Sequence, residues 1–393
     1  MYQNFQYYTP TKVVFGKGTE AEVGALVRAQ GCKKVLIHYG SGSVVKSGLL
    51  ARIEAALQEA GVSYVSLGGV VPNPRLSKIY EGIALCKAEG VDFILAVGGG
   101  SVIDSAKGIA YGVANEGDVW DLYEHTRTAS ACLPLGVVLT IAAAGSEMSC
   151  SSVVTKDEGG VKRAYDDDLS RPKFAVMNPE LTMTLPDYQT ASGACDILMH
   201  TMERYFNPNH NMDMTDGISE ALLKNVMQYT LVLRDEPANY EARAEVMWAG
   251  ALSHNGLTGC GTGGGDWATH MLEHALGGMF DVAHGAGLAA VWGSWARYVW
   301  QNAPERFVKF AVNVMGVEPC ATDAETVEAG IAAMEDFFRS VNMPTNMREL
   351  GVEPTDEQIE HMAKSCSEAV GGTAGCVKAL DVADMINIYK AAK

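Results

Sequence analysis

The chain has 393 residues, and this length predicts two domains rather than one. Its net charge of −17 argues against a nucleic-acid partner and against anionic membrane surfaces, because both bind a basic face. We expect neither a signal peptide nor a segment that spans a bilayer. Nine cysteines without paired spacing argue against a disulfide framework and favour a reducing, cytoplasmic location.

Short strands and helices alternate through the first half of the sequence. Residues 5–15 alternate apolar and polar side chains, which predicts a hairpin or an edge strand. In chain order we then expect a helix over 19–30, a strand over 33–39, a helix over 49–60, a strand over 63–67, a helix over 75–89 and strands over 92–97, 135–139, 152–155 and 174–177. Repeated strand, glycine turn and helix predict a parallel sheet with helices on both faces.

The sequence changes character after Pro186, where long helical patterns replace the β-branched runs. Residues 245–300 are rich in Trp, Met and Ala. We therefore expect a nucleotide-binding α/β domain at 1–186 and an all-helical domain at 187–393.

A glycine run stands where a nucleotide phosphate is commonly bound. Gly98-Gly99-Gly100-Ser101 follows the buried strand 92–97 and directly precedes a helix. Backbone N–H groups and the helix dipole can receive a pyrophosphate there, and glycine lets it approach the backbone. The alternative is a tight turn that binds nothing. The run is not G-x-G-x-x-G, so an ordinary Rossmann enzyme is disfavoured.

The turn after the strand 33–39 bears on the choice of cofactor. An acidic residue there would bind the ribose 2′-hydroxyl and repel a 2′-phosphate. The sequence instead has Gly40-Ser41-Gly42-Ser43, with Lys46 following. Hydroxyl donors and a nearby cation would accept a 2′-phosphate, so we predict NADP(H) in preference to NAD(H). A turn that touches no cofactor is the alternative.

Four histidines and one aspartate lie at spacings that can converge on one point. Asp196 and His200 are four residues apart, as are His270 and His274, and each pair shares a helix face. His284 follows in D-V-A-H-G-A-G. Three imidazoles and a carboxylate suit Zn²⁺ or Fe²⁺. Spacing does not decide between His270 and His274 as the ligand, and histidines satisfied within a core are the alternative.

Two neighbours of this cluster are predicted to be structural. We expect Glu273 to be a solvated helix residue rather than an acceptor for a ligand histidine. Cys195 is expected to be a small buried apolar residue rather than a functional thiol.

Motifs in this order resemble the iron-containing (group III) alcohol dehydrogenase family over almost the whole chain. The matching stretches are P-N-P at 72–74, G-G-G-S-V-I-D-S-A-K at 98–107, P-K-F-A-V-M-N-P-E-L at 172–181, D-x-x-x-H at 196–200, H-x-x-x-H at 270–274 and D-V-A-H-G at 281–285. Within the family the chain is most similar to the butanol dehydrogenase and broad aldehyde reductase branch. Its Y-G-S-G-S at 39–43 resembles the NADP-type turn of that branch.

The resemblance implies a dehydroquinate synthase-like architecture: a Rossmann-like parallel sheet with an N-terminal hairpin, followed by an all-α domain. It also implies a homodimer. It implies one divalent metal held by Asp196, His200, His270 and His284, with His274 beside the substrate. The implied cofactor contacts are Gly40, Ser41, Ser43, Asn73, Gly98, Gly99, Gly100, Ser101, Asp104, Thr140, Ser149, Lys162 and Thr182. The sequence departs from many relatives at Ile141–Ala144, where they carry more threonine and proline.

The predicted activity is hydride transfer between NADP(H) and a primary alcohol or aldehyde, with the metal as Lewis acid. His274, or water linked through the ribose, would supply the proton; a packing role for His274 is the alternative. Fe²⁺ or Zn²⁺ is favoured, and the same ligands accept Ni²⁺ or Co²⁺. The rival functions are a glycerol- or dehydroquinate-type enzyme of the same architecture and a metal hydrolase or lyase without redox chemistry.

Overall fold

A computed structural model describes residues 3–208 and 212–393. The chain forms two compact units: Thr9–Thr184, and Met1–Tyr8 together with Leu185–Lys393. The division near residue 185 lies close to the predicted boundary, but the first eight residues are grouped with the helical unit rather than with the sheet.

The first unit is built on a parallel six-stranded sheet of order β1-β8-β5-β4-β2-β3. Its strands are β1 (Lys12–Phe15), β2 (Lys34–Gly40), β3 (Ser63–Val70), β4 (Phe93–Gly98), β5 (Leu135–Leu139) and β8 (Phe174–Met177). Every neighbouring pair is parallel. Residues of β4, β5 and β8 are buried throughout, as expected where helices cover both faces. The predicted fold class is confirmed.

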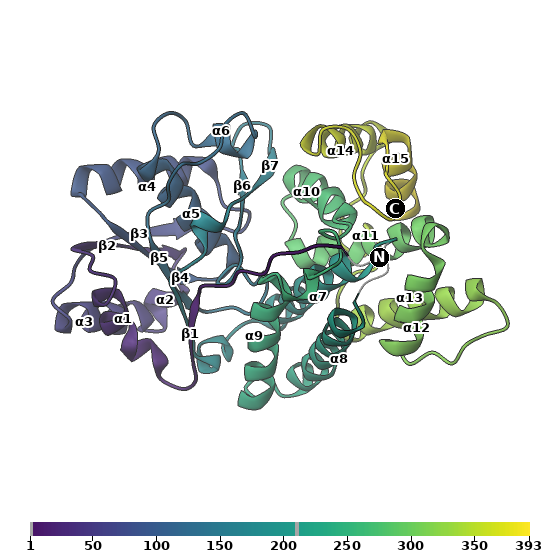
Figure 1. The fold of residues 1–393 in the computed structure, drawn as a ribbon, viewed down its shortest axis with the longest axis horizontal. Helices are drawn as coiled ribbons and strands as arrows, with labels where there is room; N and C mark the ends of the chain where they lie inside the picture. The colour runs from purple at the N-terminus through teal and green to yellow at the C-terminus, as the bar shows by residue number, and fades with distance from the viewer. Residues whose placement is uncertain (1–2, 209–211) are drawn as a thin grey trace. The chain divides into compact units, whose positions relative to one another are not determined.

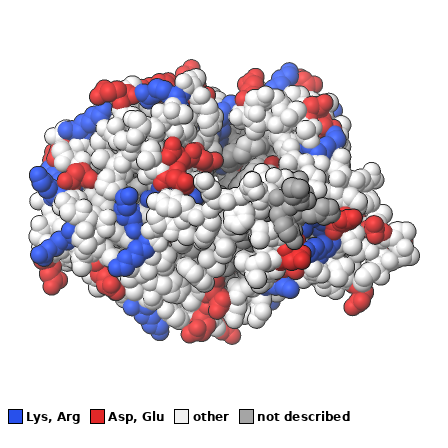
Figure 2. Space-filling model, in the orientation of Figure 1, with Lys and Arg blue, Asp and Glu red and all other residues white. Residues whose placement is uncertain are grey.

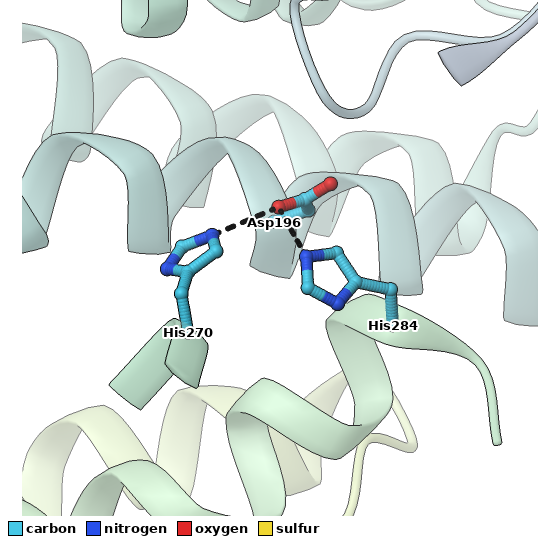
Figure 3. A group of neighbouring side chains, drawn as sticks. All are labelled: Asp196, His270 and His284. Carbon is cyan, nitrogen blue, oxygen red and sulfur yellow. Dashed lines mark ion pairs between the residues drawn. The ribbon is translucent and has the colours of Figure 1, made fainter. Parts of the chain in front are cut away.

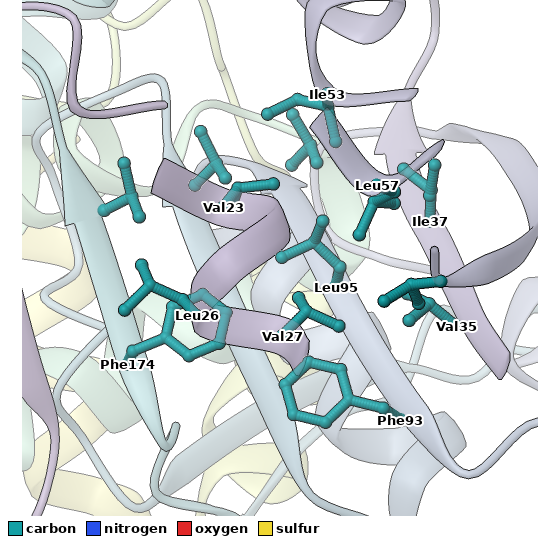
Figure 4. Close-up of a cluster of buried hydrophobic side chains, with 14 of the residues drawn as sticks. Val23, Leu26, Val27, Val35, Ile37, Ile53, Leu57, Phe93, Leu95 and Phe174 are labelled. Atoms are coloured by element: carbon teal, nitrogen blue, oxygen red, sulfur yellow. The ribbon is translucent and has the colours of Figure 1, made fainter. Parts of the chain in front are cut away.

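Helices lie on both sides of this sheet (Figure 1). They are α1 (Val23–Arg28), α2 (Ser43–Lys46), α3 (Leu49–Glu59), α4 (Leu76–Glu89), α5 (Gly100–Ala114) and the short α6 (Trp120–Tyr123). On one face, Val27 and Leu57 from α1 and α3 pack on Phe93 and Phe174 (Figure 4). The two phenylalanine rings stack with centroids 5.9 Å apart. The alternate residues of the strands face α4 and α5, as their period of two requires.

Two details of the sheet could not be read from the sequence. Of the two alternatives for the N-terminal segment, the edge strand is confirmed and the hairpin is not: β1 lies at the edge and pairs in parallel with β8, which follows it by some 160 residues in the sequence. The strand β6 (Ser151–Thr155) lies outside the main sheet, where it pairs antiparallel with β7 (Lys162–Asp166). The polar sequence of β7, K-R-A-Y-D, lacks the apolar run by which the other strands are recognised.

The second unit is helical in its described part. Its helices are α7 (Asp187–Tyr205), α8 (Asp213–Asp235), α9 (Tyr240–His254), α10 (Ala268–Phe280), α11 (His284–Val299), α12 (Pro304–Asn313), α13 (Asp323–Ser340), α14 (Asp356–Ala369) and α15 (Val382–Ala391). Capping boxes begin α13, α14 and α15. Among the described residues, no helix is both long and apolar enough to cross a membrane. On the face shown in Figure 2, acidic and basic side chains are interspersed.

Candidate functional site

Helices α7, α10 and α11 of the second unit bring the predicted metal ligands together. Asp196 and His200 lie one turn apart on α7, His270 comes from α10, and His284 is the first residue of α11. Asp196 Oδ1 is 3.4 Å from His200 Nδ1 and 3.7 Å from Nε2 of both His270 and His284. Figure 3 shows the Asp196 carboxylate facing His270 and His284. The side chains of Asp196, His200 and His270 are buried.

The facing atoms lack the hydrogen bonds that buried polar atoms normally make. Asp196 Oδ1, His200 Nδ1 and His270 Nε2 are all buried without a hydrogen-bond partner in the described structure. Leaving three such atoms unsatisfied costs several kcal/mol at about 1–3 kcal/mol each. The donor set of one carboxylate and three imidazoles is a common one for Zn²⁺ or Fe²⁺. The residues present therefore fit a divalent cation.

A buried carboxylate fixes the orientation of His270. Glu203, one turn after His200 on α7, accepts hydrogen bonds from the His270 backbone N–H at 2.9 Å and from its Nδ1 at 3.0 Å. A proton held on Nδ1 leaves the Nε2 lone pair directed at Asp196, which is the tautomer that a metal requires. Burial lowers the pKa of His270, but Asp196 and Glu203 raise it to about 9, so this position attracts positive charge.

Glu203 was not identified from the sequence, although its spacing carried a signal. Asp196, His200 and Glu203 occupy positions i, i+4 and i+7, which share one face of α7. A carboxylate on the same helix face as two candidate ligands is well placed to accept a hydrogen bond from a third ligand.

Glu273 plays the same part for His284, so its predicted role as a solvated residue is wrong. Its side chain is fully buried, and a carboxylate oxygen accepts a hydrogen bond from His284 Nδ1. Gly287 on α11 makes room for it, because a Cβ there would lie 2.9 Å from Glu273 Cγ. Two of the three candidate histidine ligands are thus oriented by buried carboxylates.

Replacing Glu273 with alanine is expected to weaken binding of Zn²⁺ by about 10- to 100-fold, because His284 loses the group that sets its tautomer and ring orientation. The measurement is competition against a chromogenic chelator. Glu335, another buried glutamate of this unit that pairs with Arg297, is the matched control. Equal Zn²⁺ affinity in Glu273→Ala and Glu335→Ala would contradict this role.

His274 lies beside the cluster rather than against Asp196. Its ring centroid is 6.3 Å from that of His270 and 5.6 Å from that of His284. The potential ligand atoms of Glu273, His274 and His284 also lie within 4.8 Å of one another, but Glu273 is already bound to His284. Of the two histidines that spacing could not separate, the geometry favours His270 as the ligand.

In the first unit, the predicted glycine turn joins β4 to α5. The amino end of α5 has no side-chain cap, which leaves its first N–H groups for an anion. The glycines have packing reasons as well: a Cβ on Gly99 would lie 1.8 Å from Ile141 Cγ2, and one on Gly100 would lie 3.1 Å from the Ala144 side chain. Residues 141–144, the segment in which the sequence differs from many relatives, therefore cover this turn closely. The uncapped N–H groups are where a pyrophosphate is predicted to bind, and close packing is a second reason for glycine at positions 99 and 100.

Two further predicted cofactor residues are part of a buried polar network beneath this turn. Asp104 accepts hydrogen bonds from Ser146 Oγ at 3.0 Å and from the Val153 backbone N–H at 3.1 Å. Ser149 accepts hydrogen bonds from Lys107 Nζ, at 2.9 Å to the Ser149 carbonyl oxygen and at 3.2 Å to the Ser149 hydroxyl. Lys107 was not singled out in the sequence. It is fully buried and also donates to the carbonyls of Ser146 and Ser151, so it fixes the segment that follows β5.

The remaining predicted contacts are spread over the carboxyl ends of the strands and nearby turns. Gly40 ends β2. Ser41, in the turn that follows, and Ser43, the first residue of α2, are both exposed. Thr140 directly follows β5 and donates its N–H to the Gly98 carbonyl at 3.1 Å. The others are Asn73, which is buried with a φ of 52°, Lys162, which is buried on β7, and Thr182, whose hydroxyl donates to the Pro179 carbonyl at 2.8 Å.

Glu147, in the same segment as Ser146 and Ser149, gives this unit a pH dependence. It is buried, and burial raises its pKa to about 7 from an ordinary 4.5, with the backbone and Lys107 acting in the opposite direction. A raised pKa in the folded state means that the folded chain keeps a proton which the unfolded chain has lost. The stability from this group is complete below pH 4.5 and is lost as the pH rises through about 7.

We therefore expect Glu147→Gln to become more stable relative to the wild type as the pH rises. Between pH 5 and pH 8 the difference in free energy of unfolding should grow by about 2–3 kcal/mol. Urea unfolding at the two values measures it, with Glu158→Gln as the exposed control. Parallel pH dependence of Glu147→Gln and the wild type would contradict the expectation.

Models of known protein families match both units of the chain. The family model described as "Iron-containing alcohol dehydrogenase" matches residues 10–179, and the one described as "Fe-containing alcohol dehydrogenase family, C-terminal" matches residues 190–393. The chain belongs to the iron-containing alcohol dehydrogenase family. Membership of this family excludes the hydrolase or lyase alternative and supports redox chemistry. The protein is a pyridine-nucleotide-dependent alcohol or aldehyde oxidoreductase that uses a metal.

Relatives in this iron-containing family differ in the cofactor that their names give. NADH-dependent butanol dehydrogenase A of Clostridium acetobutylicum is 37% identical over 98% of this chain and 99% of its own. NADPH-dependent aldehyde reductase YqhD of Escherichia coli is 35% identical over 89% of this chain and 90% of its own. The crystal structure of NADH-dependent butanol dehydrogenase A from Thermotoga maritima superposes with a TM-score of 0.96 at 35% identity, over 99% of this chain and 98% of that one.

Proposed function

We propose that the protein is an NADP(H)-dependent alcohol dehydrogenase that interconverts short aldehydes and primary alcohols. The observation that carries the proposal is the convergence of buried Asp196 Oδ1, His200 Nδ1 and His270 Nε2 without hydrogen-bond partners. Together with His284 they would hold one divalent cation, with Fe²⁺ or Zn²⁺ favoured and Ni²⁺ or Co²⁺ accepted.

When bound, the cation would act as a Lewis acid on the carbonyl oxygen, while reduced nicotinamide supplies hydride to the carbonyl carbon. This chain's own residues then have two tasks. Glu203 and Glu273 hold the Nδ1 protons of His270 and His284 and so orient both rings. His274, buried beside His270 and His284, is the proposed proton donor for the alcohol oxygen.

The proposed preference for NADP(H) rests on the turn after β2. Residues Gly40–Ser43 contain no carboxylate to repel a 2′-phosphate, and exposed Ser41 and Ser43 offer hydroxyl donors. Lys46, in the last turn of α2, adds a cation. The carboxyl ends of β2 and β4 are neighbours in the sheet, so this turn lies on the same edge as the glycine turn. The remaining predicted cofactor residues are proposed contacts in the same sense.

Elemental analysis of the purified protein, combined with rates on butanal with NADPH and with NADH, tests the proposal. We expect about one equivalent of a divalent transition metal, loss of NADPH absorbance with butanal, and a higher kcat/KM for NADPH than for NADH. A metal-free protein of full activity would refute the metal centre. Equal or better use of NADH would refute the cofactor preference alone.

We also propose a homodimer in a reducing cytoplasm. The edge strand β1 has one side that no other strand of the sheet covers in the described structure, and Phe15 at its end is exposed. The nine cysteines form no disulfide in the described structure, which suits a reducing compartment. Light scattering that gives the mass of a single chain would refute the dimer.

A further inference from the structure

His200 is held differently from the other two histidines of the proposed metal centre. His270 and His284 each have a buried carboxylate on Nδ1. Within residues 3–208 and 212–393, no carboxylate other than Asp196 contacts the His200 ring. Its surroundings are aromatic instead: the centroids of His254, His270 and Trp267 lie 4.0, 4.7 and 6.0 Å away.

Trp267 is the residue that connects these rings. Its centroid lies 5.2 Å from that of His270 and 5.9 Å from that of His254, both at steep angles. The Arg204 guanidinium lies over the indole at 4.5 Å. The same Arg204 donates to the His200 carbonyl at 2.6 Å and to the Ser253 carbonyl at 3.1 Å. The indole is therefore linked to His200 both through ring contacts and through the backbone of α7.

The backbone at Trp267 is strained, and such strain persists only where the surrounding structure imposes it. Its φ of 64° lies in the left-handed region, which bulky side chains rarely adopt. The preceding loop has glycine at its other left-handed positions, Gly261, Gly263, Gly264 and Gly265. Position 267 therefore has a backbone conformation that favours glycine, but it is occupied by tryptophan.

Neighbouring groups fix this conformation firmly. The indole N–H donates to the Gly264 carbonyl at 2.6 Å. Asp266 accepts from the backbone N–H groups of Ala268, Cys376 and Val377 at 2.8–3.1 Å. Its own N–H donates to the Glu203 carbonyl at 2.7 Å. The loop is thus tied to α7 beside Glu203, and rotation of the indole would break its hydrogen bond to the Gly264 carbonyl.

We infer that Trp267, stacked on Arg204, is a positioning residue that holds the imidazoles of His200 and His270 in the geometry that binds the metal. The inference rests on the proposed metal centre and adds a residue that the ligand set does not include. If Trp267 has this role, metal affinity depends on the presence of an aromatic ring at position 267. If the residue only stabilises the loop, metal affinity changes together with the stability of the loop.

Three variants separate these two readings: Trp267→Phe, Trp267→Ala and Trp267→Gly. Zn²⁺ affinity is measured on the full chain by chelator competition, and the melting temperature is measured on the metal-free protein. Trp267→Phe keeps a ring and should bind Zn²⁺ within about threefold of the wild type. Trp267→Ala and Trp267→Gly should both bind about 10- to 100-fold more weakly. Since glycine relieves the backbone strain, Trp267→Gly should melt higher than Trp267→Ala.

Affinity that follows the ring, with Gly equal to Ala, supports the inference. Recovery of affinity in Trp267→Gly along with its stability would overturn it, as would wild-type affinity in Trp267→Ala. Trp248→Ala, at an exposed tryptophan on α9, should leave both quantities unchanged. His270→Ala separates the two proposals: its retention of Zn²⁺, or a wild type that binds none, would refute the metal centre itself and this inference with it.

Discussion

His270→Ala is expected to lower kcat/KM for aldehyde reduction by about 10³-fold or more, which corresponds to about 4 kcal/mol of lost transition-state stabilisation. The substitution removes the buried Nε2 that faces Asp196 and leaves Glu203 without its imidazole partner. Because His270 belongs to the helical unit and the glycine turn to the α/β unit, binding of NADPH should persist. Steady-state rates, metal content and NADPH titration of one preparation measure all three effects.

The control is His361→Ala, which removes an exposed histidine of α14. It should retain wild-type turnover and metal content. A His270→Ala protein with normal kcat would show that this imidazole does not hold the catalytic cation. Lost turnover with full metal content would mean that His270 acts on the substrate and that the ligand set is different.

Much of the α/β unit could be predicted because its strands carry their own signal. The sequences of β4 and β5, F-I-L-A-V-G and L-G-V-V-L, are apolar throughout since both faces are covered. The pairing partner of β1 could not be predicted, because its register with β8 depends on contacts between distant segments. The antiparallel placement of β6 escaped prediction for a related reason: its partner β7 is polar and lacks a local pattern.

The candidate site shows the same division between local and distant information. Spacing of four residues placed Asp196 and His200 on one helix face, and that geometry is local. The burial of Glu273 is not local, since it depends on how α11 packs across α10 through Gly287. A glutamate in an amphipathic helix is usually solvated, so the sequence favoured the wrong environment. The left-handed backbone of Trp267 is likewise set by the surrounding loop rather than by the residue.

Gly40→Asp is the substitution expected to change cofactor choice most. A carboxylate at the end of β2 would repel a 2′-phosphate and accept a hydrogen bond from the ribose 2′-hydroxyl. Like charges brought together in a binding site cost several kcal/mol, so the ratio of kcat/KM for NADPH to that for NADH should fall by about 100-fold or more. Turnover with NADH should be maintained or increased.

The structure makes Gly40 the suitable position in this turn. A Cβ there would lie 3.6 Å from the Val70 carbonyl oxygen and 3.9 Å from Val102 Cγ2, which are ordinary contacts. Gly42, by comparison, has a φ of 144° and would be strained by any side chain. Gly40→Asn is the matched control, because it has the same shape as aspartate without the charge.

If the turn binds the 2′-phosphate, Gly40→Asp and Gly40→Asn should therefore differ, with only the aspartate shifting the ratio strongly toward NADH. Equal ratios in the two variants would mean that charge at this position does not reach the cofactor, and the turn would then be structural. The relatives at 37% and 35% identity carry names with NADH and NADPH respectively, so overall similarity does not decide the cofactor. The effect of a negative charge at the end of β2 on cofactor choice can be tested with the Gly40→Asp and Gly40→Asn pair.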